Sequence, residues 1–234
     1  MKSDLIRVFQ TLEHPCGYFQ DRQARNLVID PVARGLPQIY AMAIERGFRR
    51  SGGHVYRPHC RGCTACLAVR IPVARFRRSR SQRRCAQRNA DLASAVVAPR
   101  QSAEHFTLYR RYVNTRHAGA GMDDPEQDDF ERFLSCRWSP TRFLELREHG
   151  VLRAVAVLDT LPSGLSAVYT FYDPDCGRRG LGTYAILAQI ELAHEEGLPY
   201  LYLGYWIRSH PKMDYKARFR PLEVLVGGHW QTME

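Results

Sequence analysis

Residues 166–207 constrain the fold of this chain most strongly, because they carry in succession the signals of a strand, a turn, a helix and a second strand. Residues 166–172 are β-branched and aromatic, and residues 173–182 hold three glycines. Apolar residues then recur at helical spacing over residues 183–196, before Gly197 and Pro199 end the predicted helix. Residues 200–207 are apolar enough for a strand buried on both faces. A right-handed crossover makes the two strands parallel neighbours or near neighbours.

The remaining periodicity predicts an α+β fold. Residues 143–149 and 151–160 read as strands on either side of a turn at Gly150, and residues 102–115 and 127–134 as helices. Together these elements predict a GNAT-like mixed sheet flanked by helices, preceded by a small Cys-containing N-terminal subdomain. We therefore expect a Cys-containing transferase subdomain over 1–75, an Arg-rich connection over 76–100 and a GNAT-like acyltransferase domain over 101–234.

The glycine-rich turn is the first candidate for binding. Residues 178–182 follow the R-x-x-G-x-G/A pattern that GNAT-type N-acetyltransferases use on the pyrophosphate of acetyl-CoA. Such a turn presents backbone N–H groups at a helix N-terminus, where an anion or a developing oxyanion is stabilised. A tight strand-to-helix connection needs the same glycines, so both interpretations stay open.

The positive charge is concentrated in the first half of the chain. Residues 1–100 hold 19 Lys and Arg against 6 Asp and Glu, whereas residues 101–234 hold 15 against 18. Residues 75–88 include seven arginines and no acid, a pattern that predicts contact with phosphates, with Phe76 as a stacking surface. A GC-rich genome would also produce an arginine bias, and that explanation stays open. The predicted phosphate contacts are Arg75, Arg77, Arg78, Arg80, Arg83 and Arg84.

Three of the seven cysteines, Cys60, Cys63 and Cys66, follow C-x2-C-x2-C spacing, and Cys16 lies in a similar turn. Zinc would take four such ligands tetrahedrally, but three closely spaced thiols with a remote fourth are nearer to an iron–sulfur pattern. A set of reduced thiols without metal is the alternative. An odd cysteine count argues against a disulfide framework. With no long apolar run and no signal peptide, we expect a soluble, cytoplasmic protein that meets no membrane.

Long stretches of the sequence resemble the arginyl-tRNA–protein transferase family. The matching segments, which span nearly the whole chain, are residues 16–18, 47–58, 60–66, 69–76, 80–84, 166–175, 202–207 and 212–221. The resemblance implies transfer of an aminoacyl group from aminoacyl-tRNA to the N-terminal amine of a protein, which marks that protein for degradation through the N-end rule pathway. It favours leucine from Leu-tRNA, and acceptors that begin with Asp or Glu, because the chain lacks the insertions of eukaryotic arginyl enzymes. One departure is Phe19-Gln20, where the family pattern has an apolar residue and proline.

This chemistry assigns roles to several residues. An aminoacyl ester is already activated, so neither ATP nor CoA is expected, and the sequence has no P-loop. The enzyme must align the amine with the ester, remove a proton and stabilise an oxyanion. Tyr172 and Asp173 are the catalytic candidates; Asp173 would hold or deprotonate the amine, or else only start a turn. The predicted contacts with the tRNA acceptor end are Arg178, Arg179, Gly180 and Gly182. The predicted acceptor-binding residues are Arg49, Arg50, Tyr56, Arg57 and Lys216.

Three other interpretations compete with leucyl transfer. The first is the same transfer with Arg-tRNA as the donor. The second is a CoA-dependent GNAT N-acyltransferase, which would share the glycine-rich turn but has no need of the arginine run. The third is a nucleic-acid-binding module with a metal cluster and no catalysis. The second half of the chain, with its predicted GNAT-like domain, argues against this interpretation. We expect a monomer.

Overall fold

The computed structural model describes residues 6–99, 102–116 and 124–233. Its largest element is an eight-stranded sheet with the order β14-β13-β7-β12-β11-β10-β9-β8. Within this sheet β11 and β12 are parallel, and the other neighbours pair antiparallel. The sheet is therefore mixed, as predicted. Its strands are β7 (Leu67–Pro72), β8 (Leu92–Val97), β9 (Thr141–Glu148), β10 (Val151–Leu161), β11 (Gly164–Tyr172), β12 (Tyr200–Trp206), β13 (Leu222–Val226) and β14 (His229–Met233).

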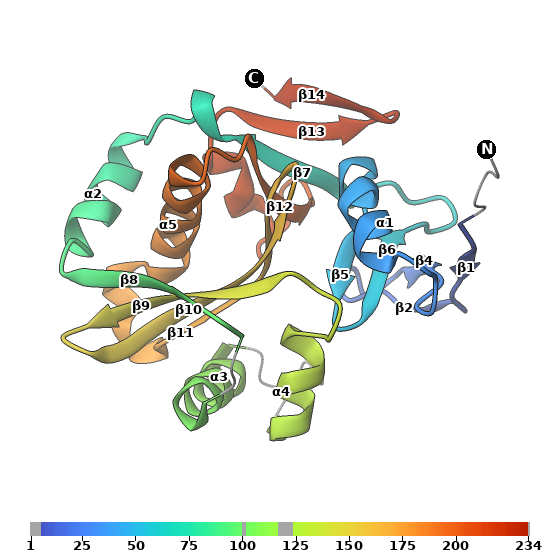
Figure 1. Cartoon of the computed structure of the whole chain (residues 1–234). Helices are drawn as coiled ribbons and strands as arrows, with labels where there is room; N and C mark the ends of the chain where they lie inside the picture. Colours follow the sequence, from blue (N-terminus) through green and yellow to red (C-terminus); the bar gives the residue numbers. More distant parts are fainter. Residues whose placement is uncertain (1–5, 100–101, 117–123, 234) are drawn as a thin grey trace.

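Helices cover both faces of this sheet (Figure 1). On one face lie α2 (Arg80–Arg88) and α5 (Leu181–Glu195), and on the other lie α3 (Ala103–Arg116) and α4 (Gln127–Leu134). The central strand β10 shows why: Ala156 and Leu158 pack toward α5, whereas Val155 and Val157 pack toward α3 and α4. Since successive side chains point to opposite faces, the continuous apolar run over residues 154–158 of β10 needs cover on both. The predicted α+β mixed sheet with flanking helices is confirmed.

The strand–turn–helix–strand unit forms as the sequence predicts, with one difference. Helix α5 begins at Leu181, two residues earlier than expected, because Gly180 adopts a left-handed conformation (φ 69°) that lets the helix start directly after a 3-10 turn over Pro174–Arg179. The parallel ladder of β11 and β12 comprises only Leu165 with Leu201 and Ser166 with Tyr202. Beyond that point the two strands no longer pair with each other, and a cavity lies between them.

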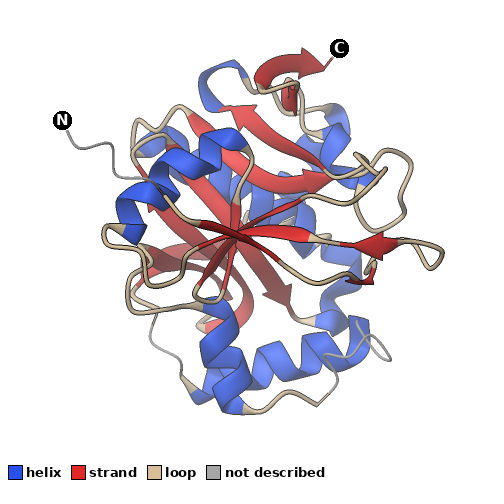
Figure 2. Cartoon of the chain, turned by 90° about the vertical axis from the view of Figure 1, so that its right-hand side faces the viewer, coloured by secondary structure: helices blue, strands red, loops and turns tan. Residues whose placement is uncertain are grey.

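The N-terminal segment adds two small sheets. Figure 2 views the molecule from the side on which this segment lies in Figure 1. One has the order β1-β4-β6-β5, and the other pairs β2 with β3. Helix α1 (Leu36–Ala43) continues into a 3-10 turn, Ile44–Arg46, and ends at Gly47, whose φ is 81°. The strands are β1 (Val8–Gln10), β2 (His14–Pro15), β3 (Gln23–Ala24), β4 (Asn26–Ile29), β5 (Arg49–Ser51) and β6 (His54–Pro58).

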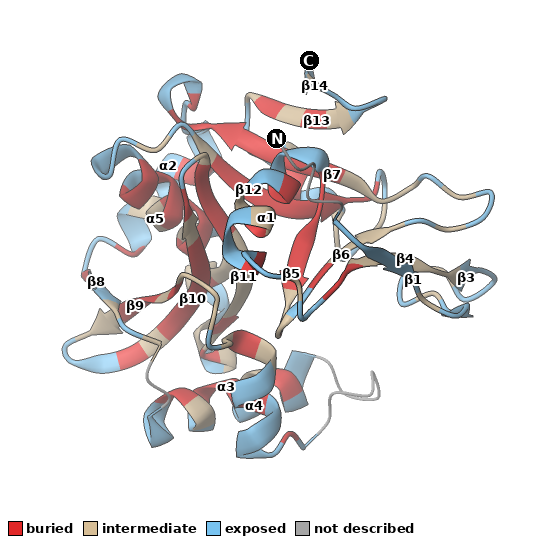
Figure 3. Ribbon diagram, turned by 45° about the vertical axis from the view of Figure 1, so that its right-hand side comes forward, coloured by how far each residue is buried: buried red, intermediate tan, exposed pale blue. Residues whose placement is uncertain are grey.

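The segment boundaries predicted at residues 75 and 100 do not separate the small sheets from the large one. Strand β7 lies inside the large sheet, between β13 and β12, and β8 forms its opposite edge. Tyr40 and Phe48 of the N-terminal segment share one apolar cluster with Leu161 and Tyr202 of the large sheet. Figure 3 shows this junction as buried, whereas β1 is exposed. A separate Cys-containing subdomain therefore stays a prediction. None of the helices in the described ranges has the length and apolarity needed to cross a membrane.

Candidate active site

A cavity of about 610 Å³ opens where β11 and β12 diverge. Residues of β11, the turn after it, the start of α5, β12 and the loop before β13 line this cavity together with residues from the N-terminal segment and α3. Among the described residues that line it there is no Asp or Glu, but there are five cations: Arg49, Arg50, Arg116, Lys212 and Lys216. An enclosed site with one sign of charge attracts ligands of the opposite sign.

Two of these cations, Arg49 and Lys216, are buried and have no ionic partner among the described residues. Each is 7% exposed. Arg49 donates to the carbonyl oxygens of Tyr202 (3.3 Å) and Ala167, and the Lys216 ammonium donates to the Tyr205 carbonyl oxygen at 2.5 Å. Neither forms an ion pair with a carboxylate of the described residues. Because a buried charge without an ionic partner is costly, both are suited to an anionic ligand.

The surroundings of Lys216 disfavour its protonated form. Burial and the neighbouring Arg49 charge lower the pKa of Lys216 to about 7, and Cys66 acts in the opposite direction. A carboxylate that entered the cavity would favour the protonated form and so would raise this pKa again.

Arg50 borders the same cavity but is fully engaged within the protein. Its side chain is 0% exposed and forms a two-pronged ion pair with Asp159, with N–O distances of 2.7 and 2.9 Å. It also donates to the carbonyl oxygens of Gly52 and Leu134 and to the Thr141 hydroxyl. Every nitrogen of the guanidinium is used, so Arg50 has a structural role and the geometry does not support its predicted contact with the acceptor.

The other predicted acceptor residues are divided between the cavity and the surface. Tyr56 lines the cavity, with its ring 6.2 Å from that of Tyr205, and burial raises its pKa. Arg57 does not line it. The Arg57 guanidinium lies 5.0 Å from the centre of the Phe48 ring and donates to the Arg46 carbonyl oxygen.

The two predicted catalytic residues are adjacent in sequence but differ in access. Tyr172 lines the cavity and packs 4.8 Å from the Tyr112 ring. A Cβ on Gly182 would lie 3.2 Å from the Tyr172 ring, so the absence of a side chain at Gly182 is what lets α5 start this close. Gly180 and Gly182 both border the cavity, which brings the glycine-rich turn and Tyr172 together.

Asp173 is not among the residues that line the cavity. Its carboxylate pairs with Arg153 (2.7 Å) and Arg111 (3.1 Å) and accepts the Asp175 N–H. Burial alone would raise the pKa of Asp173, but these hydrogen bonds and charges hold it below its ordinary value. A carboxylate so stabilised is a weak base. The contacts favour the alternative that Asp173 starts and anchors the turn.

The predicted phosphate contacts fall into three groups. Arg179 pairs with Asp91 and Glu148, Arg75 with Glu223, and Arg78 with Glu191, so these charges are already compensated. Arg77 and Arg83 donate to backbone carbonyl oxygens. The exposed side chains with neither an ion pair nor a hydrogen bond to the described residues are Arg80, Arg84 and Arg178. Phe76 follows the 3-10 turn Val73–Arg75 and is buried against Phe219 in the apolar core, so it offers no stacking surface.

The four candidate metal ligands share one neighbourhood beside the cavity. The pKa of Cys66 is raised to about 11 by burial and by Cys16, Cys60 and Cys63. Arg22 donates to the Cys63 sulfur at 3.3 Å. However, within the part of the chain that the structure describes, no three His, Cys, Asp or Glu side chains are arranged to hold a metal ion. As placed, the thiols do not form a metal site, and metal binding stays a prediction.

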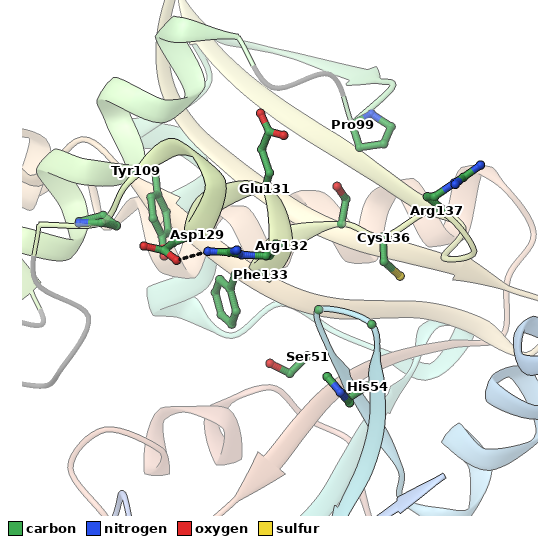
Figure 4. A pocket seen from close by; sticks show the side chains of 14 residues that line it. Ser51, His54, Pro99, Tyr109, Asp129, Glu131, Arg132, Phe133, Cys136 and Arg137 are labelled. Carbon is green, nitrogen blue, oxygen red and sulfur yellow. Dashed lines mark hydrogen bonds and ion pairs between the residues drawn. The ribbon is translucent and has the colours of Figure 1, made fainter. Parts of the chain in front are cut away.

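A second cavity, of about 1070 Å³, lies between the β5–β6 turn and α4 (Figure 4). Gly52 donates its N–H to the Phe133 carbonyl oxygen at 3.1 Å, so the turn is held against the end of α4. The lining carries both signs of charge, and Arg132 pairs with Asp129 at 2.9 Å. None of the residues predicted from the sequence lies there.

Among the residues of the first cavity that were not predicted from the sequence are Tyr18, Tyr112, Arg116 and Gln189. Tyr18 belongs to one of the segments that carry the family resemblance, which could have indicated it. Tyr112 and Arg116 lie on α3 and Gln189 lies inside α5, and no motif marks them. The packing of α3 and of α5 against β11 brings them to the site.

Comparisons with known proteins show the family of this chain. Residues 14–84 match the family described as arginine-tRNA-protein transferase, N terminus, and residues 104–226 match its C terminus. The chain is 57% identical to an aspartate/glutamate leucyltransferase of Stenotrophomonas maltophilia (strain K279a), over 100% of this chain and 95% of that protein. It is 50% identical to the protein of that name from Xylella fastidiosa (strain 9a5c), over 97% and 92% of the two chains.

Among solved structures, the chain is similar to the C-terminal domain of a putative lysylphosphatidylglycerol synthetase from Agrobacterium fabrum. The TM-score is 0.48 at 15% identity, over 74% of this chain and 53% of that one, which is too distant to bear on function. The two family matches together cover most of the sequence, and they include the cavity, the glycine-rich turn and the cysteines. The chain belongs to the arginine-tRNA–protein transferase family.

Proposed function

We propose that this protein transfers leucine from Leu-tRNA to the N-terminal amine of proteins that begin with Asp or Glu, creating a degradation signal. The observation that carries the proposal is the cavity without acidic residues, in which Arg49 and Lys216 are buried cations with no ion pair among the described residues. An acidic first residue of the acceptor supplies the missing negative charge. A neutral Asn or Gln leaves both cations uncompensated, which is how a site rejects an isostere.

The same observation separates leucine from arginine as the donor. An arginyl group would bring a guanidinium among Arg49, Arg116 and Lys216, with no carboxylate of the described lining residues to receive it. A leucyl side chain is neutral, and Leu181, Ile186 and Leu203 offer it apolar surface. The charge of the cavity therefore favours Leu-tRNA over Arg-tRNA.

The reaction exchanges an ester for an amide. The acceptor amine forms a bond to the leucyl carbonyl carbon, the bond to the terminal ribose oxygen breaks, and the proton lost by the amine ends on that ribose oxygen. In a GNAT-like layout, the amides at Gly180 and Gly182 face the phosphate of the tRNA acceptor end. Tyr172 borders both this turn and the cavity, which suits it to place the terminal ribose.

A transfer assay tests the proposal and its alternatives together. Labelled Leu-tRNA, Arg-tRNA and acetyl-CoA are offered separately with peptides that begin with Asp, Glu, Asn or Gln. We expect leucine on the Asp and Glu peptides and almost none on the Asn and Gln peptides. Arginine transfer or acetyl transfer would favour the corresponding alternative, and equal modification of Asp and Asn peptides would remove the proposed acceptor.

The lowered pKa of Lys216 predicts a pH dependence of acceptor choice. Below about pH 7 Lys216 is protonated and attracts the acceptor carboxylate, and above that pH it becomes neutral. The ratio of kcat/KM for Asp and Asn peptides should therefore fall as the pH rises through about 7. Each kcat/KM is first divided by the unprotonated fraction of that peptide's amine, because the Asp carboxylate raises the pKa of its own α-amine. A ratio independent of pH from 6 to 9 would show that the Lys216 charge does not recognise the carboxylate of the acceptor. The Arg49 charge persists throughout, so some preference remains at high pH.

The free arginines of α2 predict the salt dependence of tRNA binding. Replacing Arg80 and Arg84 with Gln should flatten the slope of log affinity against log salt by about 1 to 2, since each lost phosphate contact removes nearly one unit. In the matched control, Arg75 and Arg78 are replaced instead; because Glu223 and Glu191 already compensate them, the slope should change less. Equal slopes for the unaltered protein and the Arg80/Arg84 variant would show that these two side chains do not contact tRNA phosphates.

Three further expectations belong to this proposal: a monomeric protein, a cytoplasmic location and metal on the thiols. Sedimentation tests the first and cell fractionation the second. For the third, elemental analysis of protein kept anaerobic should find zinc or iron on Cys16, Cys60, Cys63 and Cys66. Less than about a tenth of a metal ion per chain would leave these residues as reduced thiols.

A further inference from the structure

Gln189 is a buried polar group without a full set of partners, inside the wall of the active-site cavity. The residue is 0% exposed and lies on α5. Its side-chain N–H donates to the Ala185 carbonyl oxygen at 3.0 Å, which fixes the orientation of the amide. The amide oxygen, Oε1, then has no hydrogen-bond partner among the described residues. A buried acceptor in this state is costly unless a ligand supplies the donor.

The position of Gln189 relates it to the donor substrate. Gly182, Ile186 and Gln189 lie at helical spacing on one side of α5, and all three border the cavity. Gln189 is about 10 Å along the helix axis from Gly182, at a rise of about 1.5 Å per residue. A tRNA end whose phosphate meets the glycine-rich turn therefore directs its aminoacyl group toward Ile186 and Gln189, where β11 and β12 separate.

The chemistry of the cavity limits what can donate to Oε1. The charged lining residues are all cations, and none of the described ones is a carboxylate that could receive an amine. The α-amino group of a leucyl ester carries N–H donors two bonds from the reacting carbonyl carbon. In the wall of the same cavity, Ile186 and Leu203 present apolar side chains that suit the leucyl side chain.

We propose that Gln189 determines donor specificity: its Oε1 accepts a hydrogen bond from the α-amino group of the leucyl ester, and Ile186 and Leu203 flank the leucyl side chain. This inference rests on the proposed function. Gln189 thus selects donors with a free amino group, and it acts in binding the ester, with no part in proton transfer.

The test compares Leu-tRNA with 4-methylpentanoyl-tRNA, which has the same side chain and ester but no amino group. The measured quantity is the ratio of their kcat/KM values for transfer to an Asp peptide. The unaltered protein should prefer Leu-tRNA by about tenfold or more, because the analogue leaves Oε1 unpaired. Gln189→Met, which keeps the length of the side chain without the acceptor, should bring the ratio near one. Gln189→Glu, which keeps an acceptor oxygen, should retain the preference.

Gln82→Met is the matched control. Gln82 is also a buried helical glutamine, but its amide oxygen accepts the Ser79 N–H and its nitrogen donates to the Arg218 carbonyl oxygen, away from the cavity. This variant loses a buried amide and should keep the donor ratio, even if it is less stable. A Gln189→Met variant that keeps the full preference overturns the inference, as does an unaltered protein with a ratio near one. If the unaltered protein transfers no leucine to an Asp peptide, the proposed function itself fails, which is a different result.

Discussion

Replacing Arg49 with Gln should reduce the preference for Asp over Asn peptides on the order of 10²-fold, because the substitution removes the permanent charge that faces the acceptor. Gln can still donate toward the Tyr202 and Ala167 carbonyl oxygens, so the cavity wall keeps part of its hydrogen bonding. The loss should come from slower use of the Asp peptide, while the Asn peptide changes little. The measurement is kcat/KM for the two peptides with Leu-tRNA saturating.

Arg57→Gln is the control for this prediction. Arg57 follows on the neighbouring strand β6, but its guanidinium lies over the Phe48 ring outside the cavity. The substitution also removes one positive charge and should leave the Asp-to-Asn ratio within about twofold, because a surface charge is screened by water. An Arg49→Gln protein that is folded and keeps the original ratio would rule out Arg49 as the residue that recognises the acceptor.

Replacing Arg50 with Gln should destabilise the protein by about 3–5 kcal/mol, since Asp159 then remains as a buried charge without its cation. Asp159 is 0% exposed, and Arg50 supplies two of its hydrogen bonds. Tyr40 (3.0 Å) and Thr141 (2.7 Å) still donate to the carboxylate and keep the cost from being larger. The measurement is the free energy of unfolding by urea, together with the midpoint concentration.

A surface pair provides the comparison for Arg50. Arg78 pairs with Glu191 at 2.7 Å, as closely as Arg50 pairs with Asp159, but the two side chains are 39% and 57% exposed. Arg78→Gln should therefore cost less than about 1 kcal/mol. If both substitutions have the same small effect, the Arg50–Asp159 pair does not hold the N-terminal segment to the large sheet. The folded fraction of the Arg50→Gln protein should still prefer Asp peptides to Asn peptides.

The sequence predicted local structure well wherever one period dominated. The α5 segment shows apolar residues at helical spacing between glycines, and β10 holds a continuous apolar run over residues 154–158, so each had one compatible structure. The arginine run was a different case. Its composition predicts exposure to phosphate but cannot show that Glu223, Glu191 and Asp91 compensate part of it, since those acids come from distant segments. The same holds for the segment boundary at residue 75, because β7 pairs with β12 and β13, which lie far along the chain.

Arg49 and Arg50 show what the sequence determined by itself and what it left to the tertiary structure. The sequence determined that two arginines lie on a short strand inside a segment that carries the family resemblance, and hence that cations matter there. In a strand, adjacent side chains point to opposite sides, so the two arginines meet different partners. Asp159 pairs with Arg50, whereas Arg49 donates to carbonyl oxygens of β11 and β12, and all of these partners are more than a hundred residues away. The tertiary structure also decided that Lys216 is buried and that the Gln189 amide oxygen has no hydrogen-bond partner among the described residues. A side chain loses its water and its possible partners only when distant segments pack around it.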